Sequence, residues 1–286
     1  MIEIKDLSFG YTRQDLFSHL DLKLEPGNIY GLLGKNGAGK TTLLKLIAGL
    51  RYARKGTIRV LGHDPGGRPA HVLDEVYSVS EELFIPPLLP TTYVSLYAPF
   101  YPRFSHAELD AYMTEFELEK DKKLSALSYG QKKKFVLAFG LASGCKVLLL
   151  DEPTNGLDIP SKGQFRKLLT RAASEEKIVL VSTHQVRDME NLIDPLIVLD
   201  QGRIIFQQPM SEVTRRLSAR VQASEPTEPG VLYSDRTIGG WVVVRQNTGE
   251  EETRLDLETL FNTVTGNPER VAEIFRPATA MEARNA

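Results

Sequence analysis

The stretch GKNGAGKT, residues 34–41, constrains the fold of this 286-residue chain more than any other segment. Its glycines let the backbone curl tightly, so that successive N–H groups can point at phosphate oxygens. The apolar run before it, Asn28–Leu33, is typical of a buried strand, and the apolar spacing within Lys40–Leu50 predicts a helix. A glycine-rich loop between a strand and a helix N-terminus predicts a site for the phosphates of a nucleoside triphosphate, whereas an ordinary glycine-rich turn would not need this setting.

The residues of this loop have separate predicted roles. Lys40 would reach the β- and γ-phosphates, and the hydroxyl of Thr41 would coordinate Mg²⁺. The other nucleotide-binding residues predicted in the loop and at the start of the helix are Gly34, Asn36, Gly37, Ala38, Gly39 and Thr42. A phosphate-binding loop alone leaves kinases, GTPases, helicases and transport motors open.

A second apolar run carries further candidate residues for a nucleotide-hydrolysing site. Lys146–Leu150 is typical of a central strand buried on both faces, and it ends in Asp151 and Glu152. Ligands of open α/β sheets sit at the carboxyl ends of the strands. Asp151 is therefore expected to help hold Mg²⁺, and Glu152 to orient or deprotonate an attacking water. In isolation the same pattern would fit a strand end followed by a turn, and the upstream loop favours the catalytic interpretation.

Two further segments carry candidate residues. In LSYGQ, residues 127–131, Ser128 is predicted to cap a basic amphipathic helix whose lysines form a solvated face. His184 follows the buried-strand pattern Lys177–Ser182, so it also lies at a strand's carboxyl end. An imidazole there can hydrogen-bond a γ-phosphate or the attacking water, although a lone histidine is more often structural.

Together these motifs resemble the ATP-binding cassette (ABC) ATPases over roughly residues 1–215. The chain is most similar to single-domain ATPase subunits of bacterial transporters whose membrane subunit is a separate chain. Six features in the family's order carry the resemblance: Tyr11 at the position of the adenine-stacking aromatic, the loop 34–41, the signature-like 127–131, VLLLDEP at 147–153 (Walker B), NGLD at 155–158 (D-loop) and His184 at the switch histidine.

The resemblance implies a fold and a composite site. It implies an α/β P-loop NTPase cassette over residues 1–217, with a mixed-sheet core and a helical subdomain at about 83–135. ATP and Mg²⁺ would bind one subunit, where Lys40, Glu152 and His184 are catalytic. Ser128 and Gly130 of a second cassette would close over the γ-phosphate. Asp158 would lie at that interface and also cap the helix that Pro160 begins. A homodimer is the simplest arrangement, and a heterodimer stays open.

Two positions depart from the family pattern. Tyr129 stands where a second signature glycine is usual, and we expect function to survive with a bulkier interface. In VYSVSEE, residues 76–82, Glu81 stands where the family has a glutamine that senses Mg²⁺ and faces the membrane subunit. A carboxylate can still meet a metal-bound water, so Glu81 is a predicted metal-site residue. Glu82 is the alternative if the register differs by one.

An uncharged, apolar segment, Leu83–Pro102, is as long as a membrane span, but its five prolines exclude a transmembrane helix. We expect a surface loop that docks a cytoplasmic helix of a membrane subunit through Phe84, Leu88 and Tyr93. A loop packed on its own domain is the alternative. Ser105–Phe116 is predicted to be a helix that begins at a serine cap.

The tail, residues 218–286, is predicted to be a small α+β appendage that serves dimerisation, regulation or packing. Its expected parts are a linker at 224–230, strands at 231–234 and 241–245 around a Gly239–Gly240 turn, a helix at 255–266 and ten disordered terminal residues.

The combined prediction is an ATP hydrolase on the cytoplasmic face of the plasma membrane that powers a transporter, with a lean towards export. A net charge of −2 gives no global attraction to nucleic acid, and none is expected as a partner. The single Cys145 excludes an intrachain disulfide and fits a reducing compartment.

The alternative to a transporter subunit is a soluble ABC ATPase in DNA repair or translation, although no heptad run and no second cassette is seen. A regulator without turnover is a third class, disfavoured by Glu152 and His184.

Overall fold

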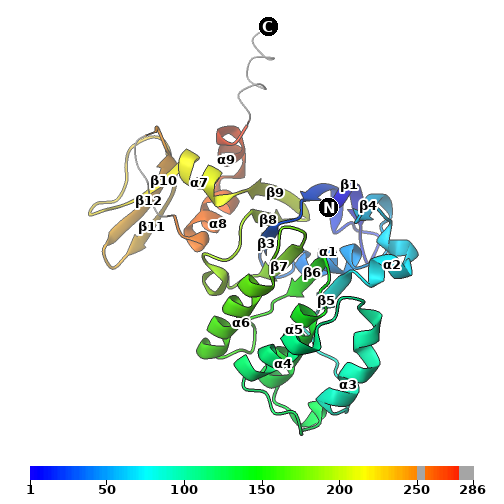
Figure 1. Cartoon of the computed structure of the whole chain (residues 1–286). Helices are drawn as coiled ribbons and strands as arrows, with labels where there is room; N and C mark the ends of the chain where they lie inside the picture. The colour runs from blue at the N-terminus through cyan, green and yellow to red at the C-terminus, as the bar shows by residue number, and fades with distance from the viewer. Residues whose placement is uncertain (250–254, 277–286) are drawn as a thin grey trace.

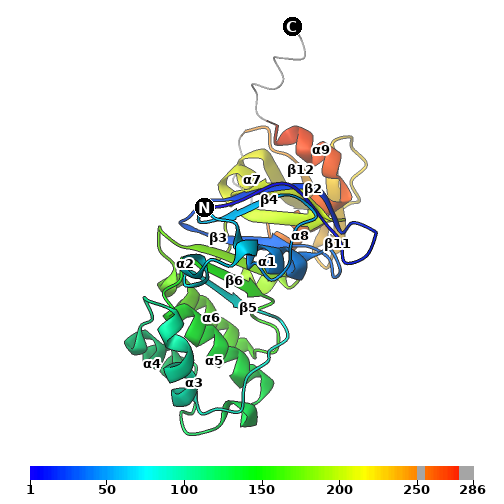
Figure 2. The same cartoon turned by 90° about the vertical axis from the view of Figure 1, so that its right-hand side faces the viewer.

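The computed structural model describes residues 1–249 and 255–276. The described residues form three sheets, with helices packed between and against them. In Figure 1 the N-terminal sheet lies at the right, a group of helices projects downward, and the C-terminal part lies at the upper left. Figure 2 shows the same layers from the side. No helix in these ranges is long and apolar enough to cross a bilayer.

The central sheet has six strands in the order β5-β6-β7-β3-β8-β9. All neighbours are parallel except β8 and β9. Every residue of β6 and β7 is buried, as expected of parallel strands covered on both faces. The predicted mixed-sheet core is therefore confirmed. Its strands are β3 (Asn28–Leu33), β5 (Val76–Val79), β6 (Val147–Asp151), β7 (Ile178–Thr183), β8 (Leu196–Asp200) and β9 (Arg203–Gln208).

An antiparallel N-terminal sheet, in the order β2-β1-β4, covers one face of the core. The helix α1 (Lys40–Ile47) shares an apolar cluster with this sheet and with Leu149 and Leu180 of the central one. The helix was predicted to reach Leu50 but ends at Ile47, because Gly49 adopts a left-handed conformation at φ +68°. The strands of this sheet are β1 (Ile2–Phe9), β2 (Phe17–Leu24) and β4 (Lys55–Val60), and a short helix, α2 (Ala70–Leu73), follows them.

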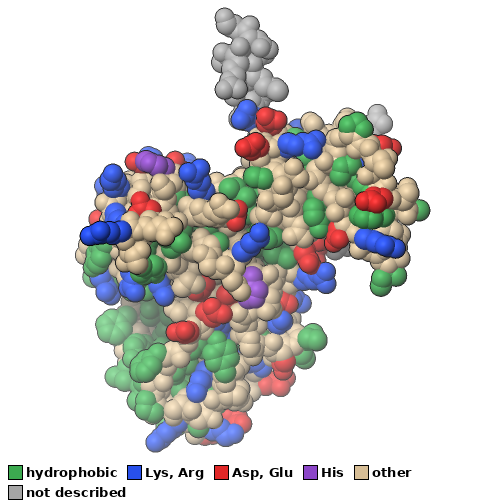
Figure 3. All heavy atoms as spheres, turned by 180° about the vertical axis from the view of Figure 1, so that it is seen from behind, with side chains coloured by type: hydrophobic (Ala, Val, Ile, Leu, Met, Phe, Trp, Pro, Cys, Tyr) green, Lys and Arg blue, Asp and Glu red, His purple; other side chains and the backbone are tan. Residues whose placement is uncertain are grey.

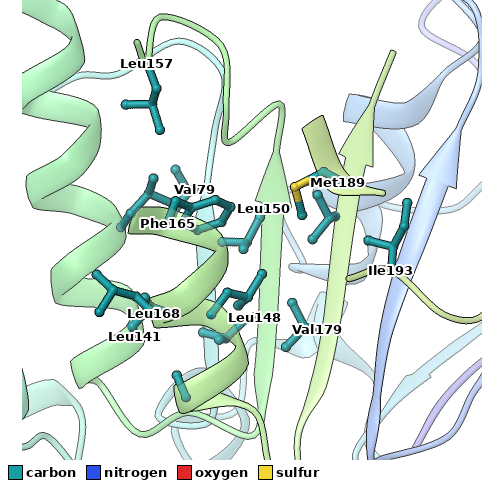
Figure 4. Packing of buried hydrophobic residues seen from close by; sticks show 14 of the residues in the cluster. Val79, Leu141, Leu148, Leu150, Leu157, Phe165, Leu168, Val179, Met189 and Ile193 are labelled. Carbon is teal, nitrogen blue, oxygen red and sulfur yellow. The ribbon is translucent and has the colours of Figure 1, made fainter. Parts of the chain in front are cut away.

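The helices α5 (Tyr129–Ala142) and α6 (Ile159–Ala172) cover the opposite face. Figure 4 shows Leu148 and Leu150 of β6 packed against Phe165 and Leu168 of α6. Alternate residues of the same strand belong to the cluster on the other face, as strand geometry requires. The carboxyl ends of the buried strands are thereby held between two layers.

The helical subdomain contains α3 (Pro90–Tyr97) and α4 (His106–Glu115) as well as α5. The segment Leu83–Pro102 was expected to be a loop, and the helix α3 within it corrects that expectation. Proline is compatible with the first turn of a helix, where its missing N–H has no acceptor, and Pro90 occupies that position. The predicted cap of α4 is confirmed, because Ser105 Oγ accepts a hydrogen bond from the Glu108 backbone at 3.2 Å.

The C-terminal part is built on an antiparallel sheet in the order β10-β12-β11. The hairpin around Gly239–Gly240 is as predicted, whereas β10 was not predicted. Leu260 and Val264 belong to the same apolar cluster as Met189, so this part packs as an extension of the cassette. The ten terminal residues expected to be disordered lie outside the described residues. The elements are α7 (Met210–Arg216), β10 (Leu217–Gln222), β11 (Val231–Thr237), β12 (Gly240–Gln246), α8 (Leu257–Gly266) and α9 (Pro268–Ile274).

Candidate active site

The phosphate-binding loop joins β3 to α1, as predicted. Gly37 and Gly39 adopt left-handed φ values of +82° and +108°, which favour glycine. A Cβ on Gly39 would lie 2.7 Å from the Phe17 ring, so a larger residue would not fit there. Lys40 is buried, and its Nζ donates to the carbonyl oxygens of Gly34 at 2.8 Å and Lys35 at 3.4 Å. The ammonium group and the N-terminus of α1 therefore create positive potential at the loop.

The remaining loop residues lie around this cation. Asn36 is exposed at the mouth of a cavity, and Ala38 packs against the N-terminal apolar cluster. Thr42 is buried, with its hydroxyl 3.2 Å from that of Tyr11. The Tyr11 ring is 58% exposed and stands edge-on to Phe9. Its free surface is available to a flat base, which fits the predicted contact with adenine.

A hydroxyl and a carboxylate meet at the predicted metal site. Thr41 Oγ1 donates to Asp151 Oδ2 at 2.7 Å, across 110 residues of sequence. The Ser182 hydroxyl donates to the other oxygen of Asp151 and so fixes the carboxylate. Mg²⁺ is usually held by one or two protein oxygens together with phosphates and water, so this pair fits it. Within the described ranges, no group of three or more His, Cys, Asp or Glu side chains is arranged to hold a metal.

Glu81 is not brought to this pair. Its Oε1 accepts a hydrogen bond from Asn155 Nδ2 at 3.1 Å. No hydrogen bond joins it to Thr41 or Asp151, both of which lie in the described part of the chain. Its role at the metal stays a prediction.

Glu152 lies between the other two predicted catalytic residues. Its Oε1 lies 2.8 Å from His184 Nδ1 and 3.8 Å from Lys40 Nζ, so one carboxylate oxygen contacts both other predicted catalytic residues. The side chain is almost fully buried, and its backbone N–H donates to the Ser182 carbonyl at 3.0 Å. Its φ of +45° is unusual for a non-glycine residue, and such strain is common at functional sites.

The signature residues form a helix cap away from the loop. Ser128 Oγ accepts from the Gln131 backbone at 3.2 Å, and Gln131 Oε1 accepts from the Ser128 backbone at 3.0 Å, which completes a capping box. Asp158 caps α6 through the Ser161 backbone at 3.0 Å, and hydrogen bonds from Ser161 lower the pKa of its carboxyl. Within the described residues, no hydrogen bond joins Ser128, Gly130 or Asp158 to the loop 34–41.

The expectation that the lysines of α5 form a solvated face is wrong for Lys133. It is fully buried, and its Nζ donates to the carbonyl oxygens of Ser80 and Asp151 at 3.4 Å each. Burial lowers the pKa of its ammonium group to about 8, against the opposing effect of nearby carboxylates. The signal was present in the sequence, because position 133 lies three and four residues before the apolar Val136 and Leu137.

A cavity of about 590 Å³ lies beside the loop and His184. One wall comes from residues 33–36 and another from residues 183–188. The third wall comes from α8, with Glu258, Phe261 and Asn262, and it was not predicted. The C-terminal part therefore reaches the predicted nucleotide-binding loop.

Comparison with known proteins identifies the family of the chain. Residues 17–155 match the family described as ABC transporter. The Nod factor export ATP-binding protein I of Burkholderia lata is 33% identical over 220 residues, which are 72% of this chain and 70% of that protein. The ABC transporter ATP-binding protein YtrB of Bacillus subtilis is 27% identical over 239 residues, or 83% and 82% of the two chains.

Solved structures agree as well. The ATP-binding subunit of an ABC transporter superposes with a TM-score of 0.69 at 26% identity, over 75% of this chain and 92% of that one. The predicted family and fold are confirmed, and so are the binding and hydrolysis of ATP. The chain belongs to the ABC transporter family, in which it is an ATP-binding subunit that hydrolyses ATP to power transport.

Proposed function

We propose that the protein drives an exporter as a homodimer bound to a separate permease chain at the cytoplasmic face of the plasma membrane. The observation that carries the catalytic part is the position of Glu152 Oε1, 2.8 Å from His184 and 3.8 Å from Lys40. A buried carboxylate between an imidazole and an ammonium group can orient a water and accept its proton beside a γ-phosphate.

The roles of the other residues follow from where they lie. Lys40 would exchange its bonds with the carbonyls of Gly34 and Lys35 for the β- and γ-phosphates, which offer stronger acceptors. Thr41 and Asp151 would hold Mg²⁺, whose charge offsets that of the phosphates. His184, held by Glu152, would donate to the γ-phosphate or orient the attacking water.

The separation of the signature from the loop supports a dimer. Each chain has one phosphate-binding loop and one signature, and in the described residues no hydrogen bond connects them. Ser128 and Gly130 at the N-terminus of α5 would close over the γ-phosphate bound to a second copy, where the helix dipole favours an anion. ATP would thus bind the closed dimer better than the open subunits, and hydrolysis would release them.

An exposed apolar surface supports the permease contact. We call it the docking patch, and it consists of Phe84, Leu89, Leu96 and Phe100 around α3, where Figure 3 shows hydrophobic side chains gathered on the helical subdomain. Phe84 is 96% exposed, whereas Leu88 and Tyr93 are half-buried. Tyr93 packs edge-on against Phe135 and Phe139 and is not part of this surface. Exposed apolar patches of this kind mark interaction sites.

The direction of transport rests on relatives. The Burkholderia relative is named for the export of Nod factor, and it aligns with 72% of this chain. That name supports export for this subunit, while the transported molecule would be chosen by the permease.

Capture of the permease tests the proposal. Tagged Glu152→Gln, expected to bind ATP without turnover, is purified from detergent-solubilised membranes with Mg-ATP. The matched control is tagged Lys40→Ala, which should not bind ATP. A polytopic membrane protein recovered in stoichiometric amount with the first variant supports the proposal. Ribosomes, DNA-processing proteins, or a wholly soluble protein without partners would contradict it.

A further inference from the structure

Tyr129 and Glu81, the two residues that depart from the family pattern, contact each other. The Tyr129 hydroxyl donates to the backbone carbonyl of Glu81 at 2.7 Å, across 48 residues of sequence. Tyr129 is the first residue of α5, and Glu81 follows the end of β5. One hydrogen bond therefore links the signature segment to the segment that leads out of the central sheet.

The Tyr129 ring also packs on the turn after β6. A Cβ on Gly156 would lie 2.5 Å from two ring carbons, and Gly156 has a left-handed φ of +79°. A Cβ on Gly130 would lie 2.8 Å from the Gly156 carbonyl oxygen. Both positions require glycine because the start of α5 and this turn are in direct contact.

Glu81 also contacts this turn, through its side chain. Its carboxylate accepts a hydrogen bond from Asn155 Nδ2 at 3.1 Å, and Asn155 precedes Gly156 in the same turn. The Asn155 backbone N–H donates to the Glu152 carbonyl at 3.2 Å. Tyr129 is thus connected through Glu81 and Asn155 to the residue that would accept the proton from water.

A second residue of α5 makes the same kind of contact one turn later. Lys133, at the i+4 position from Tyr129, donates to the carbonyls of Ser80 and Asp151. Residues four apart lie on one face of a helix. This face of α5 therefore binds the backbone of Ser80, Glu81 and Asp151.

We infer that Tyr129 is a positioning residue for ATP hydrolysis, which holds the Glu81 and Asn155 segments in one arrangement around Glu152. This inference rests on the proposed function, because only there is Glu152 the proton acceptor and Ser128 the contact with ATP of a second copy. Contact of that ATP with Ser128 would then be transmitted through Tyr129 to the catalytic carboxylate of its own subunit. Tyr129 touches no reacting atom in this arrangement.

Tyr129→Phe isolates the hydroxyl, because the ring and its packing on Gly156 are kept. We expect kcat for ATP to fall roughly fivefold to tenfold, as for loss of one hydrogen bond that positions a catalytic group, with KM unchanged within about twofold. Tyr52→Phe is the matched control, since Tyr52 is 66% exposed and its ring lies against Gly66, which is not among the predicted site residues. A kcat for Tyr129→Phe within about twofold of the wild type overturns the inference.

A double-mutant cycle tests the route through Glu81. If Tyr129 and Asn155 act together, Tyr129→Phe combined with Asn155→Ala should lower kcat about as much as the stronger single change. If the fold-losses in kcat of the two single variants multiply in the double variant, the two residues act independently and the route through Glu81 is overturned. Neither change should shift the thermal midpoint enough to account for the loss in kcat.

Amide hydrogen exchange on the nucleotide-free chain separates this inference from the proposed function. Tyr129→Phe should speed exchange at Asn155 and Leu157, whose N–H groups bond within the turn to Glu152 and Thr154. Unchanged exchange overturns the positioning role. Absence of ATP-dependent dimers in the wild type would contradict the proposed function instead, while the exchange result would still decide whether Tyr129 holds the turn.

Discussion

The Nδ1 atom of His184 lies 2.8 Å from Oε1 of Glu152, although the two residues follow different strands. Neighbouring parallel strands bring their carboxyl ends to one edge of the sheet, and β6 and β7 are paired with Asp151 opposite Ser182. The register of these two strands therefore places both side chains at the same edge of the sheet. The pair is therefore present before a nucleotide or a second subunit arrives.

Replacing Glu152 by glutamine should lower the rate of ATP hydrolysis by about two orders of magnitude or more. An amide keeps the shape of the side chain but cannot accept the proton of water. Binding of ATP should be retained, because Lys40 and the loop 34–41 are untouched. Phosphate release and equilibrium binding of a fluorescent ATP analogue measure the two effects. Glu176→Gln, an exposed carboxylate, is the control, and equal turnover in both variants would contradict the role of Glu152.

His184→Ala should lower kcat by about 10- to 100-fold, since Glu152 loses its contact with the ring and the γ-phosphate or the attacking water would lose its proposed partner. The dissociation constant for ATP should change by less than about threefold. Single-turnover hydrolysis and equilibrium binding give the two values. His63→Ala changes an exposed histidine far along the N-terminal sheet and should resemble the wild type. Equal loss of binding and turnover in His184→Ala would indicate a structural histidine.

The parts of the site that depend on local pattern could be predicted from the sequence. Glycine spacing, apolar periodicity and caps act within a few residues, so they indicated the loop 34–41, the start of α5 at Ser128 and the start of α6 at Asp158. Walker-type spacing also placed Asp151 and Glu152 at a strand end. These assignments needed no information about distant segments.

Other features depend on contacts between distant segments, and the sequence did not reveal them. The acceptors of Lys133 lie 53 and 18 residues away, so helical spacing indicates that this side chain faces the core but not which groups it binds. Likewise, the partner of the Tyr129 hydroxyl is 48 residues distant. The strand β10 contains mixed polar and apolar residues and forms because β12 offers an edge for pairing. Its sequence alone does not favour a strand over a loop.

The C-terminal part should be held by apolar packing more than by its ion pair to the cassette. Leu260→Ala removes a side chain that is 1% exposed and should cost about 2–5 kcal/mol. Glu258→Gln removes the ion pair with Arg187. The side chains of Glu258 and Arg187 are 47% and 82% exposed, so the loss should cost less than about 1 kcal/mol. Urea unfolding monitored by circular dichroism compares the two. A separate early transition confined to the Leu260 variant would contradict a shared core.

Charges in the docking patch should abolish permease binding while leaving the isolated ATPase intact. Phe84→Asp with Leu96→Asp places two carboxylates in a surface that would be desolvated in the complex, which is unfavourable without partners. Ile238→Asp is the control, because Ile238 is fully exposed on the hairpin of the C-terminal sheet. Co-purification with the permease and ATPase activity are measured for both variants. Normal complex formation by the Phe84/Leu96 variant would exclude this surface.

Cys145 should make the stability of the protein depend on pH in the alkaline range. Burial raises the pKa of its thiol from the ordinary 9.0 to about 11, and the side chain is 1% exposed. Between these values the folded chain keeps a proton that the unfolded chain has lost, so the free energy of unfolding falls as pH rises. The full effect is roughly 2–3 kcal/mol, reached near pH 11, and it is absent below about pH 9.

Cys145→Ala removes this dependence, whereas the buried tyrosines, whose pKa values are also raised by burial, are present in both chains. The free energy of unfolding of the wild type should therefore fall relative to that of the variant as the pH rises from 9 to 11. Urea unfolding at intervals of half a pH unit measures this difference directly. A difference that stays constant over the interval would mean that the thiol ionises in the folded chain as freely as in the unfolded one, and hence that solvent reaches the space between Cys145 and the Asp74 carbonyl.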